Sequence, residues 1–215
     1  MRKELDYFKI ENRPGGSQEW FRDPLMRIGG CAAIAACESC IDLDLHHGTD
    51  LYPYEKTKLC REDYVDFGMR MKPYLHPRLM GINRLEMYIR GFGKYLTDRG
   101  SFGLRMVPFH GARETEAAKR AVKAQIDRNL PIPFLLLKHQ NLTFRNYVWH
   151  WFLLTGYEGT KEEFRVKAVT YGNFRWLSLD ALWDTGYPKK GGMILYELSE
   201  ESEKFSWKTG DSMIK

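Results

Sequence analysis

The chain lacks a long apolar run. Its opening residues, 1–6, lead into no apolar stretch of signal-peptide length, and no segment approaches the length that spans a membrane. We therefore expect a cytoplasmic protein without membrane association. An excess of one charge is also missing, because 33 Lys and Arg against 28 Asp and Glu leave a formal net charge of +5. Since these charges are spread in mixed-sign segments, the pattern argues against a nucleic-acid partner.

Cysteine is scarce, with four residues in the chain: Cys31, Cys37, Cys40 and Cys60. Nothing marks the chain as secreted, so we expect reduced thiols rather than disulfides. Cys37 and Cys40 form a C-x-x-C pair, and Cys60 with His46 and His47 makes a zinc site conceivable. A second paired-ligand element is absent, however, and no strand precedes the pair as in thioredoxin-like redox sites. We expect neither a metal nor a cofactor.

The chain is long enough to form a hydrophobic core, and it is rich in aromatic side chains. Its 215 residues suit one domain, which we assign to residues 1–198, followed by a polar tail over 199–215. The 6 Trp, 12 Tyr and 12 Phe indicate a core or cleft built from aromatic side chains.

Helical patterns come first along the chain and strand patterns afterwards. Residues 1–27 look irregular, apart from a short strand at 7–10. Helices are predicted over about 31–43, 61–71, 82–97 and 114–128, with a short one at 179–183. Strands are predicted over 101–108, 131–137, 147–157, 164–171, 174–177 and 193–198. This segregation favours an α+β fold over a doubly wound sheet.

Cys31 stands where a glycine loop becomes a helix. Gly29 and Gly30 precede it, and the alanine-rich residues 32–36 carry the helix onward. A thiol in the first turn feels unpaired N–H groups and the helix dipole, which can lower its pKa from about 8.5 to roughly 3.5–7.5. Cys31 is therefore a candidate nucleophile. The alternative is a small apolar side chain where the helix meets the core.

His150 is a single titratable ring in the most apolar predicted strand. Alternation puts His150 and Phe152 on one face and Trp151 and Leu153 on the other, and both faces are apolar. A buried imidazole needs a partner. If that partner is the Cys31 thiol, the two form a nucleophile and general base. The alternative is a core histidine bonded to a backbone carbonyl.

Other polar residues suggest no second site. His76, His110 and His139 lie near turns or strand ends without a ligand-spaced neighbour, so we interpret them as structural. Asp42 and Asp44 fall at the predicted end of the helix over 31–43, where we expect solvated carboxylates.

The order of the two candidates, an early helical cysteine and a strand histidine over a hundred residues later, is typical of papain-like enzymes. Further similarity lies within residues 119–183, where 124–133 read AQIDRNLPIP, 150–159 read HWFLLTGYEG, 166–172 read VKAVTYG and 177–183 read LSLDALW. The chain resembles the papain-like cysteine peptidase superfamily, in particular the bacteriocin leader-processing (double-glycine) branch. The resemblance implies a papain-like α+β fold, with a cysteine helix packed on an antiparallel sheet.

The resemblance also implies an oxyanion glutamine and a residue that orients the histidine. The family has Cys-Gly-Pro-Ala with a glutamine about six residues earlier, whereas this chain has Cys31-Ala-Ala and Leu25 at that distance. Gln18 is the nearest candidate, provided that the segment around Pro24 loops out. The Cys31 backbone N–H would be the second donor.

The orienting amide of the family falls at Val169 in this chain, so Thr170 or Asn173 would have to take its role.

The leading hypothesis is a cysteine peptidase or amide hydrolase in which Cys31 attacks a carbonyl and His150 transfers the proton. Its substrate would be a peptide or another amide. Acyl transfer to an amine is an alternative, because enzymes resembling the butirosin-pathway acyltransferases use the same apparatus. The other alternative is a non-catalytic member that binds a peptide in an aromatic-rich groove.

Overall fold

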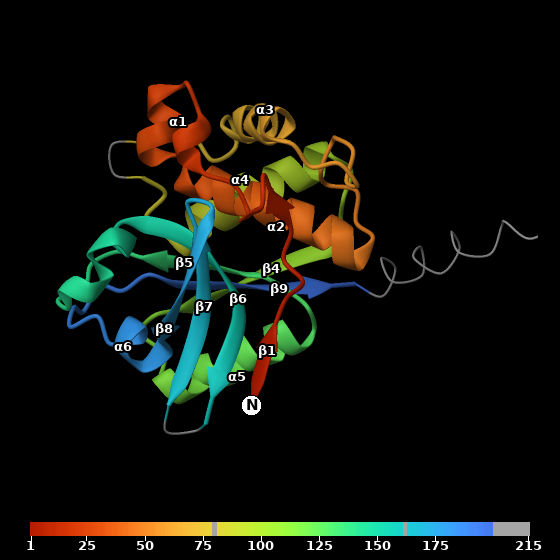
Figure 1. Cartoon of the computed structure of the whole chain (residues 1–215). Helices are drawn as coiled ribbons and strands as arrows, with labels where there is room; N and C mark the ends of the chain where they lie inside the picture. The colour runs from red at the N-terminus through yellow and green to blue at the C-terminus, as the bar shows by residue number, and fades with distance from the viewer. Residues whose placement is uncertain (79–80, 161–162, 200–215) are drawn as a thin grey trace, which may run out of the picture.

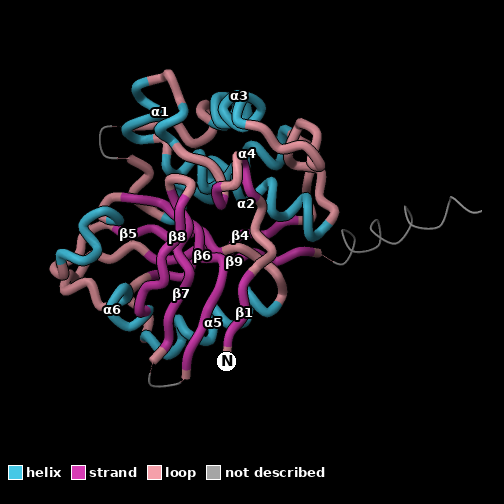
Figure 2. Tube along the Cα trace, viewed as in Figure 1, coloured by secondary structure: helices cyan, strands magenta, loops and turns pink. Residues whose placement is uncertain are grey.

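The computed structural model describes residues 1–78, 81–160 and 163–199, which form an α+β fold of helices and a mostly antiparallel sheet (Figure 1 and Figure 2). The helices are α1 (Pro24–Gly29), α2 (Cys31–His47), α3 (Arg61–Met71), α4 (Leu85–Asp98), α5 (Thr115–Asp127) and α6 (Leu179–Trp183), with 3-10 helices η1 (Gln18–Trp20) and η2 (Leu142–Tyr147). The strands are β1 (Arg2–Glu4), β2 (Lys9–Ile10), β3 (Arg13–Pro14), β4 (Leu104–His110), β5 (Ile132–Leu136), β6 (His150–Gly159), β7 (Phe164–Thr170), β8 (Asn173–Ser178) and β9 (Gly192–Leu198).

Strands β1 and β4–β9 form one sheet. Its order is β4-β9-β5-β6-β7-β8, and β1 pairs with the distal half of β6, at Glu4 opposite Gly156. The pairings described in this sheet are antiparallel. β6 therefore lies between β5 and β7, and its first residue, His150, stands opposite Leu136 of β5.

Helices cover both faces of the sheet. Figure 1 shows α1–α4 on one side and α5 with α6 on the other. Trp151 and Leu153 of β6 belong to the core beneath α2, whereas Phe152 and Leu154 belong to the core against α5 and α6. These four residues confirm the predicted alternation, and β6 is an interior strand.

Helix α2 is the central helix of the molecule. It continues past its predicted end at Leu43 to His47, and Gly48 ends it in the left-handed conformation, with φ at 64°. From Cys31 to Asp44 every residue is buried, rather than only the predicted apolar stripe. The reason is that α2 is packed between α3 and strands β5 and β6.

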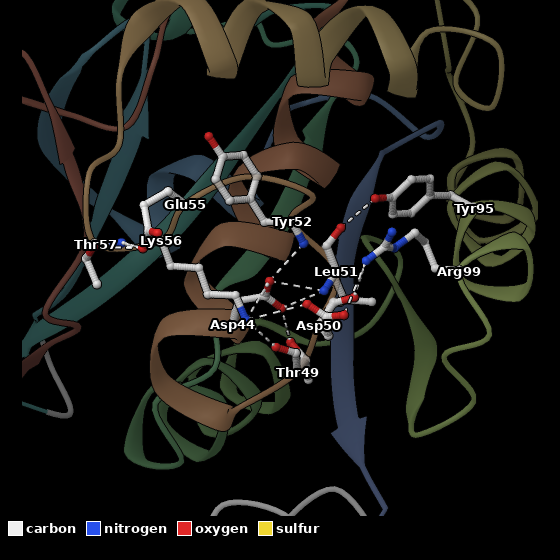
Figure 3. A network of polar contacts seen from close by, with 10 residues as sticks. All are labelled: Asp44, Thr49, Asp50, Leu51, Tyr52, Glu55, Lys56, Thr57, Tyr95 and Arg99. Carbon is white, nitrogen blue, oxygen red and sulfur yellow. Dashed lines mark hydrogen bonds and ion pairs between the residues drawn. The ribbon is translucent and has the colours of Figure 1, made fainter. Parts of the chain in front are cut away.

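The expectation that Asp42 and Asp44 are solvated is wrong, because both side chains are buried in the last turns of α2. Asp44 accepts hydrogen bonds from the backbone N–H groups of Leu51 and Tyr52, each at 2.8 Å, and Lys56 lies 3.5 Å away (Figure 3). Asp44 thus anchors the loop that follows α2. Neither carboxylate oxygen of Asp42 has a hydrogen-bond partner among the described residues.

The N-terminal segment is more ordered than predicted. β1 joins the sheet, the expected strand over 7–10 is reduced to β2, and a helix, α1, begins at Pro24. Asp23 caps α1 by accepting a hydrogen bond from Met26 N at 2.9 Å. With six residues, α1 is too short for a helical period to be visible in the sequence.

The other predicted helices and strands are present, with ends shifted by a few residues. Of the predicted tail over 199–215, residues 200–215 lie outside the described part of the chain. Among the helices that are described, none combines the length and the apolar character needed to cross a membrane.

Candidate active site

Cys31 is the first residue of α2, directly after a sharp junction with α1. A Cβ on Gly30 would lie 2.5 Å from the Met26 carbonyl oxygen, so glycine is needed at this joint. The Cys31 side chain is mostly buried, with 8% of the residue exposed, and it lines an open cleft. The position at the helix start matches the sequence prediction.

His150 opens β6 and is held from two sides. Its Nε2 lies 2.7 Å from Thr170 Oγ1 at the end of β7, and its ring is stacked on Tyr171, with centroids 4.9 Å apart. Tyr171 and Gly172, with φ at 54° and 66°, form the two-residue turn between β7 and β8. This tight hairpin fixes both partners of the imidazole.

A narrow crevice brings together four of the five predicted site residues: Gln18, Cys31, His150 and Thr170. Its free space of about 10 Å³ holds about one water. Gln18 reaches the crevice because α1 takes up the segment around Pro24, and its Nε2 donates to the Arg27 carbonyl at 2.8 Å.

Asn173, the fifth predicted residue, lies elsewhere. It is exposed at the start of β8, and its Oδ1 accepts from Phe174 N at 2.7 Å. It lines neither the crevice nor the clefts beside it. Of the two alternatives for a residue that orients His150, Thr170 is the one in contact with the ring.

Burial decides the protonation of the pair. It raises the pKa of the Cys31 thiol, although the backbone N–H groups of Trp151 and Ala32 act in the opposite direction. The expected lowering of this pKa is therefore wrong, because desolvation outweighs the helix start. Burial also lowers the pKa of His150 to about 4. At neutral pH both groups are uncharged in the resting protein.

Two wider clefts adjoin the crevice and share lining residues with it. The first, of about 760 Å³, is lined by Cys31, His150 and mainly apolar side chains, among them Leu25, Ile28, Pro77, Ile82, Val148 and Trp149. The second, of about 700 Å³, is more polar and includes Gln18, Glu19 and Arg27. The two share Ile28, Asn146 and Tyr171, so they form one surface past the crevice.

Trp149 shows backbone strain at the cleft wall. Its φ of 55° is a conformation that bulky side chains rarely adopt and that costs on the order of 1–3 kcal/mol. The residue directly precedes His150, and its N–H donates to the Leu137 carbonyl at 3.0 Å. Strain of this kind is concentrated at functional sites, and here it turns the chain into β6.

The zinc alternative finds no support in the described residues, where no group of three His, Cys, Asp or Glu side chains is arranged to hold a metal ion. Cys37, Cys40 and Cys60 are free thiols. The Sγ of Cys60 instead accepts from Asp63 N at 3.5 Å and caps α3.

Three contributors were not predicted from the sequence: Glu38, Tyr171 and the backbone N–H of Trp151. Glu38 lines the crevice from α2 and is one of few polar residues on a buried helix. Its spacing of seven residues from Cys31 could have identified it from the sequence, because residues seven apart lie on the same face of a helix. Tyr171 and the Trp151 N–H depend on strand pairing, which no local pattern reveals.

Comparisons with known proteins do not identify the chain. No protein-family model matches it, and no curated protein does.

Proposed function

We propose that this protein is a cysteine hydrolase that cleaves a peptide or amide bond through Cys31 and His150. The observation that carries the proposal is the shared crevice, which is lined by the Cys31 thiol at a helix start, by the His150 imidazole at a strand start and by Thr170, whose Oγ1 lies 2.7 Å from His150 Nε2. Because Thr170 holds Nε2, the other ring nitrogen, Nδ1, is left to accept the thiol proton.

The chemistry follows in two steps. The Cys31 sulfur attacks the carbonyl carbon while His150 takes the thiol proton, and the carbonyl π pair moves onto oxygen. The oxyanion then collapses, the C–N bond breaks, and His150 gives its proton to the leaving amine. Water, deprotonated by the same imidazole, releases the acid and restores the thiol. The Cys31 backbone N–H and the Gln18 side chain would donate to the oxyanion.

A neutral resting pair is compatible with this cycle. Because burial disfavours both the thiolate and the imidazolium, the proton moves during attack rather than before it. His150 then acts as a general base, and Thr170 Oγ1 accepts a hydrogen bond from Nε2–H as positive charge develops.

The shape of the surface favours an extended substrate. The apolar cleft and the polar cleft share three lining residues, and Cys31 lines the apolar one. We infer that an extended chain lying in both would pass close to Cys31. A peptide with apolar side chains on one side of the scissile bond fits this arrangement.

A papain-like fold is part of the same proposal. It is supported by the chain order, with the cysteine on α2 and the histidine on β6, and by the packing of that helix on an antiparallel sheet. The motif similarity over residues 119–183 points in the same direction.

The test is digestion of a mixed peptide library followed by mass spectrometry. New amino termini should appear with the wild-type protein and be absent with Cys31→Ala, while His150→Ala should lower their rate of appearance at least about a hundredfold. Adding a primary amine tests the acyl-transfer alternative, because an acyltransferase would form the new amide in preference to the free acid. Equal cleavage by all three proteins would contradict the proposal.

A second candidate is a peptide-binding module without catalysis. The observation that favours it is the neutrality of both Cys31 and His150 in a buried site. In that case the library would be retained by the wild-type protein and by Cys31→Ala alike, and every peptide would be recovered intact.

A further inference from the structure

Glu38 makes its contacts with a loop that belongs to the candidate site. Its Oε1 accepts hydrogen bonds from Gly16 N at 2.8 Å and from Tyr64 Oη at 3.0 Å, and its Oε2 accepts from Tyr7 Oη at 2.8 Å. Gly16 lies in residues 15–18, which we call the Gln18 loop because they end on Gln18. A carboxyl that is 3% exposed is thus bonded to the backbone of this loop.

Glu38 and Cys31 project from the same side of α2. They are seven residues apart, which is about two helical turns or about 10 Å along the axis. Both line the crevice, together with Gln18 from the loop. One rigid helix therefore carries the candidate nucleophile at its start and, two turns later, the carboxyl that holds the loop with the candidate oxyanion donor.

The loop fits against this carboxyl without spare room. A Cβ on Gly15 would lie 2.7 Å from Glu38 Oε1, and a Cβ on Gly16 would overlap the ring of Tyr64. Gly15 N also donates to the Phe8 carbonyl at 3.1 Å, which gives the loop a second anchor. Glycine at both positions lets the backbone approach the carboxyl closely.

We propose that Glu38 is a positioning residue that holds the Gln18 loop against α2 and thereby keeps the Gln18 amide beside Cys31, where an oxyanion would form. This inference rests on the proposed function, because it assigns Glu38 a part in the same acyl-transfer chemistry. Glu38 does not touch the substrate. It acts through Gly16 N and the short chain from Gly16 to Gln18.

The experiment compares two reactions of Cys31 that differ in their need for an oxyanion. Acylation by p-nitrophenyl acetate forms the Sγ–C bond through a tetrahedral oxyanion and expels nitrophenolate, whose release is followed by absorbance. Alkylation by iodoacetamide displaces iodide at a saturated carbon, so no oxyanion forms. The ratio of the two rate constants isolates the oxyanion contribution from the reactivity of the thiol.

Gln18→Ala should lower this ratio by about tenfold to a hundredfold, and Glu38→Ala should lower it by a similar factor. Because the two residues act in series, the double variant should be no worse than either single variant, within about twofold. Glu38→Gln keeps an acceptor for Gly16 N and should restore the ratio to within about threefold of wild type. Ser39→Ala, the next buried polar residue of α2, bonds to the Ala35 carbonyl instead and should leave the ratio unchanged.

Gly16→Ala provides a second route if Glu38→Ala does not fold. It displaces the same loop through Tyr64 while leaving the carboxyl in place, and it should reproduce the loss.

An unchanged ratio in Glu38→Ala or in Gly16→Ala, or losses that multiply in the double variant, would overturn the inference. So would an unchanged ratio in Gln18→Ala. Failure of the proposed function looks different, because nitrophenolate release would then persist in Cys31→Ala and His150→Ala.

Discussion

At the scale of single residues, Thr170 is the contact that decides how His150 presents its ring. Replacing it in Thr170→Val removes the 2.7 Å partner of Nε2 without changing the side-chain shape. Losing a hydrogen bond worth about 1 kcal/mol, and with it one favoured tautomer, should slow iodoacetamide alkylation of Cys31 about tenfold at neutral pH. The measurement is the alkylation rate by mass spectrometry.

Thr155 supplies a matched control in the same sheet. Its hydroxyl is buried and has no hydrogen-bond partner among the described residues. Thr155→Val should therefore leave alkylation unchanged and should not destabilise the protein, because it removes an unsatisfied polar group. An equal slowing in both variants would show that Thr170 has no specific part in orienting His150.

Glu38, in the same region, makes the stability of the protein depend on pH. Burial raises its pKa from 4.5 to about 7, so the folded protein binds a proton that the unfolded chain releases between these values. The corresponding stability is present below about pH 4.5 and is lost as the pH rises through 7. Relative to Glu38→Gln, the wild-type protein should lose about 2–3 kcal/mol of unfolding free energy between pH 5 and pH 8.

Urea denaturation at several pH values measures this difference. The other buried groups near Glu38, which are Tyr7, Tyr64, Cys37 and Asp42, are present in both proteins, so the comparison isolates the carboxyl. If the free energy of unfolding changed with pH in the same way in both proteins, the predicted contribution of Glu38 would be contradicted.

At the scale of elements, Asp44 joins α2 to the loop that follows it. In Asp44→Ala the buried N–H groups of Leu51 and Tyr52 would lose their acceptor, and Thr49 its partner (Figure 3). Leaving such donors unpaired costs about 1–3 kcal/mol each, so the free energy of unfolding should fall by about 2–4 kcal/mol.

Asp50→Ala is the matched control in the same network. Its side chain is 84% exposed and pairs with Lys56 and Arg99, an arrangement worth at most about 1 kcal/mol. Urea denaturation of both variants compares them directly. Similar losses of unfolding free energy in the two variants would mean that the buried hydrogen bonds of Asp44 contribute no more than the exposed ion pairs of Asp50.

The elements also show what could be predicted from the sequence. Amphipathic helices such as α3 and α5, and the apolar strand β6, follow from periodicity because each has one environment per face. The burial of α2 does not follow from periodicity, because its alanine and cysteine side chains make no face distinctly polar or apolar. Asp42 and Asp44 also suggest a solvated helix end. α1 was not predicted because it is short, although Asp23 followed by Pro24 is typical of a helix start.

At the scale of the whole molecule, the candidate site exists only where the helical layer meets the sheet. Cys31 comes from α2, His150 from β6 and Thr170 from β7, while Gln18 comes from η1. Residue types and chain order were enough to select Cys31 and His150. The choice of Thr170 over Asn173, and the parts of Glu38 and Tyr171, depend on strand register and helix packing, which are set by the assembled fold.

The most direct test of the account is the pH dependence of Cys31 alkylation by iodoacetamide in the wild-type protein and in His150→Ala. An isolated buried thiol with a raised pKa reacts through its thiolate, so its rate rises about tenfold per pH unit. When an imidazole whose pKa is about 4 takes the proton, the rate becomes nearly independent of pH above that value. Between about pH 5 and pH 8 we expect a flat profile for the wild-type protein and a tenfold rise per unit for His150→Ala. The same steep rise in both proteins would show that the thiol and the imidazole do not act as a pair.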